Sequence, residues 1–564
     1  MKNQNQKKPP IGLLLAVMLF SVSGVTAEDI TWTGTANDGS WDTPSNWNPA
    51  RAITNADTVI FNAGGTLAIS MASVQTVGNL TFGAAATGSI TIDLKGLRLN
   101  VGIADNTTGG GISVLAGHHE IIGANWNGGD IYFNGTGYQH LVLINWNIAD
   151  GASLTLTNVH IRSNNNAAKI AKTGAGLMVL AGDSVGTTNA WGTGLLDIQA
   201  GTVRIAHAKA TGNVTNNFQV RAGATLDLAA GYNSIDGTLT LNGTGLGGNG
   251  ALYNSTGDNT IDEGAGTIAL ASTSTVGVAD NTLLTIRQDI SGNGGLVKNG
   301  GGTLHLAQTT TDSTFAGGTT VNAGTLRVSH DKALGDAAAA ATINAGGTLQ
   351  IDSGTTLANH LALAGGHVER SVAAGEMWTL GTTGRVTSAI AGGTAGGTET
   401  GAQILASQAA SGTGKLDYAF AGSGTSAAGN DSLRASDVLA ITGTGNDIYV
   451  LSLNVSGLGD GYQLVWLNAA GQWENAVAGN SLTAGASALA SVAGSFAESG
   501  ASATGAWLGT WGYDAANGTV WAILDHGGEF AVLSTAIPEP AAFALILGAV
   551  LGGGLVFSRK MRNG

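Results

Sequence analysis

Three short stretches bring together residue types that bind metals or perform acid–base chemistry: His118-His119-Glu120, Ser329-His330-Asp331 and Asp525-His526. The first lies in strand-like alternation, where neighbouring side chains point to opposite faces, so its histidines are not expected to share a metal ion. The second holds the residue types of a hydrolase triad, but triad members are rarely sequence neighbours and no nucleophile-elbow pattern surrounds them. We interpret the first as a solvated corner and the others as a turn and a loop. The sequence predicts no catalytic residue, metal site or cofactor.

A segment near residue 445 partly fits the calcium-binding nonapeptide pattern, through Gly443, Gly445, Asp447 and Tyr449. The nearest acidic partner, Asp431, lies 16 residues before Asp447, whereas two stacked turns of this kind need a separation of about 18. Calcium binding requires tandem turns that face one another. We therefore do not expect a calcium site here.

A polysaccharide-cleaving enzyme on a repetitive β scaffold needs paired carboxylates, or a basic residue, on one face of neighbouring coils. The variable outward positions of the repeat described below hold residues of mixed kinds: Arg204, Asp227, Thr240, Ala269, His305, Arg327 and Gln350. This mixture favours a non-enzymatic protein. A β-helical enzyme acting on extracellular polysaccharide stays open as the alternative.

Trp32, Trp41 and Trp47 lie close together near the start of the chain. Flat aromatic faces suit sugar rings, but the open first coil of a solenoid must also be covered by bulky side chains. Terminal repeats are expected to be atypical. We favour the interpretation that these tryptophans form a cap.

The elements that must position all these residues are expected to be short strands. The 564 residues include 90 glycines but no cysteine, and only 11% are charged. The six prolines are at positions 9, 10, 44, 49, 538 and 540, so residues 50–537 contain none. Many short strands joined at glycine corners account for this composition, and an uninterrupted hydrogen-bond ladder accounts for the absence of proline.

One pattern recurs along the chain: a small residue, Thr, an aliphatic residue, any residue, and another aliphatic residue. It begins at residues 201, 224, 237, 266, 302, 324 and 347. Thr202 and Thr225 are 23 residues apart, as are Thr325 and Thr348, which predicts equivalent strands on successive coils. We expect an all-β chain with a right-handed parallel β-helix over 28–400, of roughly 17 coils of about 22 residues and some 80 Å in length.

A longer unit also repeats. The stretch KTGAGLMVLAG (172–182) matches KNGGGTLHLAQ (298–308), and QAGTVRIAHAKA (199–210) matches NAGTLRVSHDKA (322–333). Residues 294–329 resemble the autotransporter-associated β-strand repeat, and the opening WTGTANDGSWDTPSNW (32–47) resembles the start of such proteins. The resemblance implies a passenger-like β-helix.

From about residue 400 the strands become longer, as in DIYVLSLNV (447–455) and TVWAILDHGGEFAVL (519–533). Residues 401–536 resemble the C-terminal β module found between such repeats and a sorting tail. We expect a smaller, β-sandwich-like module.

Residues 1–27 fit a secretory signal peptide, with lysines before a short apolar run and small residues ending at Ala27, where we expect cleavage. At the other end, the apolar run 541–557 is 17 residues long, the lower limit for a membrane helix. Arg559, Lys560 and Arg562 follow it. Because positive charge stays on the cytoplasmic side, a single C-terminal transmembrane helix would leave the body of the protein exported.

Pro538-Glu539-Pro540 lies directly before that apolar run, and its two prolines hold an extended, accessible peptide. The tripeptide, helix and basic tip of 537–564 together resemble the PEP-CTERM sorting signal of Gram-negative bacteria that make extracellular polysaccharide. The resemblance implies recognition by an exosortase, a membrane transpeptidase that acts near the motif. It also implies anchoring in the inner membrane before processing and a later location at the cell surface or in the matrix.

Between the two terminal segments the chain is strongly acidic. Without the six basic residues and one acidic residue outside 28–537, there remain 17 basic and 36 acidic residues, a net charge of −19. Such a surface repels phosphates, so nucleic acid is excluded as a partner. We expect an elongated surface, adhesion or scaffold protein whose partners are an exosortase and, as a candidate, extracellular polysaccharide.

Overall fold

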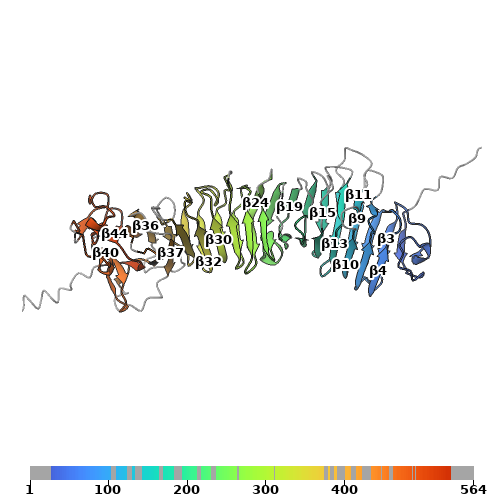
Figure 1. Ribbon diagram of the computed structural model, residues 1–564, viewed down its shortest axis with the longest axis horizontal. Coiled ribbons are helices and arrows are strands. Elements are labelled where there is room, and N and C mark those ends of the chain that lie inside the picture. The colour runs from blue at the N-terminus through green and yellow to red at the C-terminus, as the bar shows by residue number, and fades with distance from the viewer. Residues whose placement is uncertain are drawn as a thin grey trace, which may run out of the picture.

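The computed structural model describes residues 27–534 apart from short internal stretches, the longest being 134–142, 183–193, 390–399 and 422–432. Most of the expected signal peptide and the whole expected sorting tail, 537–564, lie outside the described residues. The described chain is a rod of stacked strands, with β3 and β4 near one end and β40 and β44 at the other (Figure 1). It is all-β, and the helical elements with described bounds are short turns of 3₁₀-helix: η1 (Pro44–Asn46), η2 (Leu246–Gly248), η4 (Ala476–Gly479) and η5 (Gly505–Trp507).

The rod is a solenoid whose coils contribute strands to three faces, each face being a parallel ladder. The first face consists of β1 (Asp29–Trp32), β3 (Thr58–Phe61), β6 (Asn79–Phe82), β9 (Gly111–Val114), β12 (Leu143–Ile148), β15 (Lys169–Thr173), β17 (Leu195–Ile198), β19 (Asn217–Val220), β21 (Leu239–Gly243), the start of β24 (Ile268–Val278) and β26 (Ile290–Ser291). The second face consists of β4 (Thr66–Ser70), β7 (Ser89–Asp93), β10 (His118–Ile122), β13 (Ser153–Thr157), β16 (Leu177–Ala181), β18 (Thr202–Ile205), β20 (Thr225–Leu228), β22 (Leu252–Asn254), the end of β24, β27 (Leu296–Asn299), β29 (Thr319–Val321), β31 (Ala341–Asn344), β33 (Leu361–Ala364) and β35 (Val386–Ser388).

The third face is described in two parts. The first part consists of β5 (Gln75–Val77), β8 (Arg98–Val101), β11 (Asp130–Phe133) and β14 (His160–Ser163). The second part consists of β23 (Asp258–Ile261), β25 (Leu283–Ile286), β28 (Thr303–Leu306), β30 (Gly324–Val328), β32 (Gly347–Ile351) and β34 (His367–Val372).

The expected equivalence of strands 23 residues apart is confirmed. Thr202 pairs with Thr225, and Thr325 pairs with Thr348. Coil length is not uniform, however, because paired residues are separated by 19 positions between Thr348 and His367 and by 35 between His118 and Ser153. Because the early coils contain more residues, the solenoid has fewer coils than an even period of about 22 residues predicts.

One hydrophobic core fills the rod from Ile30 to Val532. Alternation along each strand produces it: in β28, for example, Leu304 and Leu306 are buried while Thr303 and His305 are partly exposed. Because every coil places aliphatic side chains above those of the coil before it, burial continues along the axis without a break.

The two copies of the longer repeat lie on different faces. In the first copy, Lys172 is on the first face and 177–181 is on the second. In the second copy, Lys298 is on the second face and 303–306 is on the third. Between the copies lies β24, which pairs with first-face strands through its start and with second-face strands through its end. The repeat unit is therefore displaced by one face between its two copies.

The N-terminal end is closed by an aromatic cap. Trp32, Trp41 and Trp47 are 7%, 1% and 3% exposed and pack around Phe61 with ring centroids 5.6–5.9 Å from it. β2 (Trp47–Asn48) pairs antiparallel to β1 and completes the cap. The tryptophans are buried in the core, as the cap interpretation predicts, and present no open face to a sugar.

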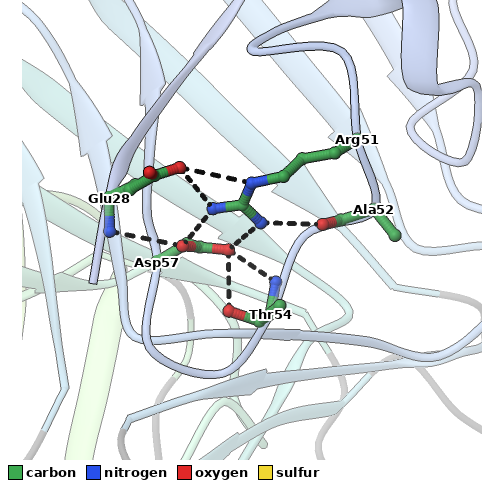
Figure 2. A network of polar contacts seen from close by, with 5 residues as sticks. All are labelled: Glu28, Arg51, Ala52, Thr54 and Asp57. Atoms are coloured by element: carbon green, nitrogen blue, oxygen red, sulfur yellow. Dashed lines mark hydrogen bonds and ion pairs between the residues drawn. The ribbon is translucent and has the colours of Figure 1, made fainter. Parts of the chain in front are cut away.

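An ion-pair network holds the chain that leads into the cap. The Arg51 guanidinium donates to the carboxylate of Asp57, with Nη2 2.7 Å from Oδ1 and Nη1 2.8 Å from Oδ2, and Nη2 also lies 3.0 Å from Glu28 Oε2 (Figure 2). The Thr54 backbone N–H and hydroxyl both donate to Asp57 Oδ2. Burial raises the pKa of Asp57, but these hydrogen bonds outweigh it and lower the pKa to about 2.

At the other end, antiparallel strands continue two of the solenoid faces. β34 of the third face pairs with β37 (Gly414–Ala421), and β35 of the second face pairs with β36 (Thr400–Ser407). The third-face sheet then runs through β38 (Val438–Thr442), β45 (Gly528–Ser534), β40 (Tyr462–Leu467) and β41 (Trp473–Asn475). The second-face sheet runs through β39 (Tyr449–Val455), β44 (Thr519–Leu524), β43 (Trp511–Asp514) and β42 (Val492–Ala493). Both sheets pack on the same core as the solenoid.

No helix within the described residues is long and apolar enough to cross a membrane. The expected transmembrane helix at 541–557 lies outside them.

Candidate functional site

His118, His119 and Glu120 lie on β10 and point alternately outward and inward, as strand geometry predicts. The interpretation as a solvated corner is wrong, because the stretch is a ladder strand and His119 is buried in the core. The inward His119 ring stacks on Phe82 with centroids 4.4 Å apart, and its Nδ1 accepts a hydrogen bond from the Ile90 N–H at 3.2 Å. Outward, His118 Nδ1 lies 2.9 Å from Ser153 Oγ, and Glu120 accepts from the Thr157 hydroxyl. These side chains have structural partners, and no cluster of three potential metal ligands occurs among the described residues.

The side chains of Ser329, His330 and Asp331 have different partners, and Ser329 contacts residues of the neighbouring coils. Ser329 Oγ lies 2.6 Å from His305 Nε2 and donates to Asp352 Oδ2 at 2.5 Å. In a catalytic triad the histidine is in the middle and accepts the serine proton. Here the serine is in the middle and its proton is directed to Asp352, so His305 must donate through Nε2–H. The arrangement is a cross-coil hydrogen-bond ladder and does not activate Ser329 as a nucleophile.

Asp525 and His526 lie in the loop between β44 and β45, as expected. Asp525 accepts from the Ser481 N–H at 2.9 Å and from the Leu482 N–H at 2.9 Å. His526 Nε2 lies 2.9 Å from the Ala476 carbonyl, and its ring packs against Trp466. Both residues fix the segment 476–482 onto the sheet.

The segment with partial calcium-binding character forms a turn in which Gly443 and Gly445 have positive φ. The Asp447 N–H donates to the Thr444 carbonyl across this turn. Asp431, the partner considered for it, lies outside the described residues.

Outward positions of opposite charge pair between coils. Arg204 Nε lies 2.7 Å from Asp227 Oδ2 on the next coil, and Arg327 Nη2 lies 2.9 Å from Asp352 Oδ2. Arg204 and Asp227 stand directly opposite each other in the ladder, where complementary charges stabilise the pairing, whereas Arg327 stands opposite Gln350 and reaches past it to Asp352.

Two buried lysines, which sequence reasoning did not single out, occupy equivalent places in the two copies of the longer repeat. Lys172 Nζ donates to the carbonyls of Thr173, Gly174 and Ala200 at 3.1, 2.8 and 3.0 Å. Lys298 Nζ donates to those of Asn299, Gly300 and Ala323 at 3.0, 2.6 and 3.0 Å. Both side chains are fully buried, and burial lowers the pKa of each to about 8. Both copies of the longer repeat begin with lysine in the sequence, and this shared residue is the signal that could have identified the pair.

A groove lies on the outer face of the second-face sheet in its antiparallel part. Alternation places two cross-strand rows on its floor. The first row is Gly401–Asn454–Thr519–Asp514, and the second is Gln403–Ser452–Trp521. The cavity has a volume of about 520 Å³, within the range of small-molecule sites. We call it the β39 groove.

One wall of the β39 groove is the segment 495–497. The indole Nε1–H of Trp521 donates to the Gly494 carbonyl at 3.1 Å, and the Phe496 ring packs edge-on against Trp521 with centroids 5.4 Å apart. Ser495 and Glu498 exchange hydrogen bonds that close a turn in the same segment. The wall is therefore fixed to the sheet.

The polar groups of the floor are amides, hydroxyls and one carboxylate. Asn454 Nδ2 lies 3.1 Å from Thr519 Oγ1, and Asp514 Oδ2 accepts from Asn517 Nδ2 at 2.7 Å. Hydrolysis of glycosidic bonds ordinarily requires a second carboxylate across the site, and among the described lining residues Asp514 is the only acidic one.

Residues 296–328 match the passenger-associated-transport-repeat family. They include Lys298, β28 and β30, and they cover nearly all of the 294–329 stretch on which the resemblance to autotransporter-associated repeats rests. The chain is also similar to the adhesin BmaC autotransporter of Brucella suis biovar 1 (strain 1330), with 30% identity over 169 residues. That alignment covers 26% of this chain but only 5% of the adhesin. No solved structure gives a match.

The chain thus carries passenger-like β-solenoid repeats of the kind found in exported surface proteins.

Proposed function

We propose that this protein is a non-enzymatic surface or matrix protein whose solenoid acts as a rigid spacer and presents a long side to glycan or to another cell. The observation that carries the proposal is the continuous hydrophobic core that runs from Ile30 to Val532. With a cap at one end and antiparallel strands at the other, the rod holds its two ends far apart (Figure 1). The likeness to an autotransporter adhesin supports a role in adhesion.

The proposal includes a route to the surface. Residues 1–27 direct export, and the tail carries Pro538-Glu539-Pro540 before an apolar run and a basic tip. We propose that the apolar run is a transmembrane helix that holds the protein in the inner membrane of a Gram-negative bacterium until an exosortase reads the Pro-Glu-Pro motif. The order of the three features at one end of a signal-bearing chain supports this route.

Replacement of Glu539 with Ala tests the sorting step. The variant should stay in the inner-membrane fraction at its unprocessed mass, whereas the unaltered protein should reach the surface with a smaller mass. Glu529→Ala, at an exposed position in β45, is the matched control and should behave as the unaltered protein does. Normal size and location of the Glu539 variant would overturn the sorting proposal and leave the surface proposal standing.

Accessibility on intact cells tests the surface proposal. An antibody against the solenoid should label whole cells, and external protease should remove the label. Labelling only after cells are opened would contradict it. Incubation of the purified protein with matrix polysaccharide should release no reducing sugar, and steady release would establish the enzymatic alternative instead.

A further inference from the structure

The β39 groove lies directly beside a covered part of the same sheet face. On the outer side of β39 and β44, Val450, Trp521 and Ile523 are buried beneath Ala503 and Leu508. Farther along the same strands and on the same face, the outward residues that line the groove are Ser452, which is 4% exposed at its bottom, and the partly exposed Asn454 and Thr519. The outward residues change from apolar to polar where the segment that contains Ala503 and Leu508 stops covering the sheet. The open part is therefore built to meet water or a polar ligand.

The polar groups of the floor can both donate and accept hydrogen bonds. Gln403 and Ser452 stand opposite each other on paired strands, as do Asn454 and Thr519. Asn454 Nδ2 and the Thr519 hydroxyl already donate to the Asn517 carbonyl, so Gln403 and Ser452 are the pair that can serve a ligand. Amides offer an acceptor and two donors, and hydroxyls offer both functions. A ligand that presents several hydroxyl groups along one edge complements such rows, because each hydroxyl also donates and accepts.

The rim of the groove supplies apolar surface on two sides. Leu405 is 37% exposed, and Phe496 is partly exposed on the opposite wall. Trp521 lies beneath Phe496 and is itself fully buried, so it positions the wall and does not contact a ligand. A sugar ring has the matching character, with C–H faces for apolar side chains and hydroxyl edges for polar ones.

The charge of the groove selects among saccharides. None of its described lining residues is lysine, arginine or histidine, and Asp514 carries a negative charge. Phosphorylated, sulfated or uronic-acid units would meet no cation here, in a protein whose net charge is already −14.

We propose that the β39 groove binds a neutral saccharide unit, with Gln403 and Ser452 as hydrogen-bonding residues on its floor. The proposal names the ligand class for the surface role described above. The saccharide proposal depends on the surface role only for the place where the protein meets its ligand. Binding itself is measured on the purified chain and does not depend on that role.

The test titrates the purified full-length protein with cellohexaose, maltohexaose, mannohexaose and xylohexaose, and with an alginate hexasaccharide as the charged counterpart. At least one neutral hexasaccharide should bind, and the alginate hexasaccharide should not. Gln403→Trp, which fills the groove, should abolish binding. Gln403→Ala should weaken it roughly tenfold, the effect of losing one or two hydrogen bonds.

Gln350→Ala, at an outward position of β32, is the matched control and should bind as the unaltered protein does. The proposal is overturned if no neutral hexasaccharide binds at millimolar concentration, if alginate binds better, or if the Gln403→Trp variant binds unchanged. Should that variant fail to fold, the Gln403→Ala and Ser452→Ala titrations decide, and unchanged affinity in both overturns the proposal. Cell-surface labelling is unaffected by any of these outcomes, so the two proposals fail separately.

Discussion

Lys172 and Lys298 make the same three hydrogen bonds from two different faces of the solenoid. Each ammonium group donates to the carbonyls of the next two residues and to a carbonyl on the following coil, just before a glycine of positive φ. The contact thus belongs to the repeat unit and not to one face of the rod. It joins consecutive coils at a corner, where strand pairing ends.

Replacing Lys298 with Met should destabilise the solenoid by about 1–3 kcal/mol, because three buried carbonyl groups lose their donor. The midpoint of denaturant unfolding, followed by circular dichroism, measures the change. Lys332→Met, at a side chain that is 60% exposed, is the control and should change the midpoint little. Equal midpoints for the two variants would contradict the structural role of Lys298.

The buried lysines also predict a pH dependence. Their pKa is about 8 in the folded protein, below the ordinary value of 10.5. Between these values the unfolded chain binds more protons than the folded one, so the free energy of unfolding should rise with pH. From pH 8 to 9.5 the gain should be about 2 kcal/mol per lysine, and the Lys172→Met/Lys298→Met double variant should lose it. A flat profile for the unaltered protein would contradict the prediction.

The low pKa of Asp57 predicts a loss of stability at acidic pH. Its pKa of about 2 lies below the ordinary 3.8, so its contribution is complete above pH 4 and is lost as pH falls towards 2. Asp57→Asn should remove about 2 kcal/mol from the N-terminal cap at neutral pH. Limited proteolysis near residues 28–57 reports the loss. Glu28→Gln, whose side chain is 50% exposed, should have a much smaller effect, and equal cleavage of the two variants would count against the network.

Gly324 and Gly354 offer a matched pair of substitutions. Both have positive φ, which costs an alanine about 1–2 kcal/mol. At Gly324 a Cβ would also lie 2.4 Å from the Gly300 carbonyl oxygen, whereas at Gly354 it would meet nothing within 4 Å. Gly324→Ala should therefore be the more destabilising substitution by about 1–3 kcal/mol. Thermal unfolding of the two variants compares them directly, and a smaller shift for Gly324→Ala would overturn the assignment.

Leu326 tests whether the coils unfold together. It is fully buried in β30, between β28 and β32. Leu326→Pro should interrupt the ladder and open the repeat region to protease. Leu326→Met, which keeps the volume and the backbone N–H, should stay resistant. Resistance of the proline variant would show that coils tolerate a local break.

Several features of this fold were predictable because they follow from local alternation. The 23-residue spacing identified Thr202 and Thr225 as equivalent, and opposite orientations of His118 and His119 follow from strand geometry. Burial of the N-terminal tryptophans follows from the need to cover the first coil.

The remaining features depend on how strands meet at corners and across coils. The displacement of the repeat by one face arises in β24, an 11-residue strand whose sequence does not reveal that it spans two faces. The pairing of Ser329 with His305 and Asp352 joins three coils. The β39 groove depends on the register of three antiparallel strands and on where a covering segment ends. None of these relations is encoded in a local period.

The direction of the coil-to-coil hydrogen bonds determines how the rod responds to pulling. These bonds lie along the long axis, so tension between the two ends separates coils in the direction in which their ladders open, while a sideways push must bend covalent strands. Under end-to-end load, the coils at a pulled end should open before the interior ones, and every opened coil releases its own length of chain. A tethered molecule of this shape would therefore lengthen stepwise under flow while its remaining coils keep their faces intact.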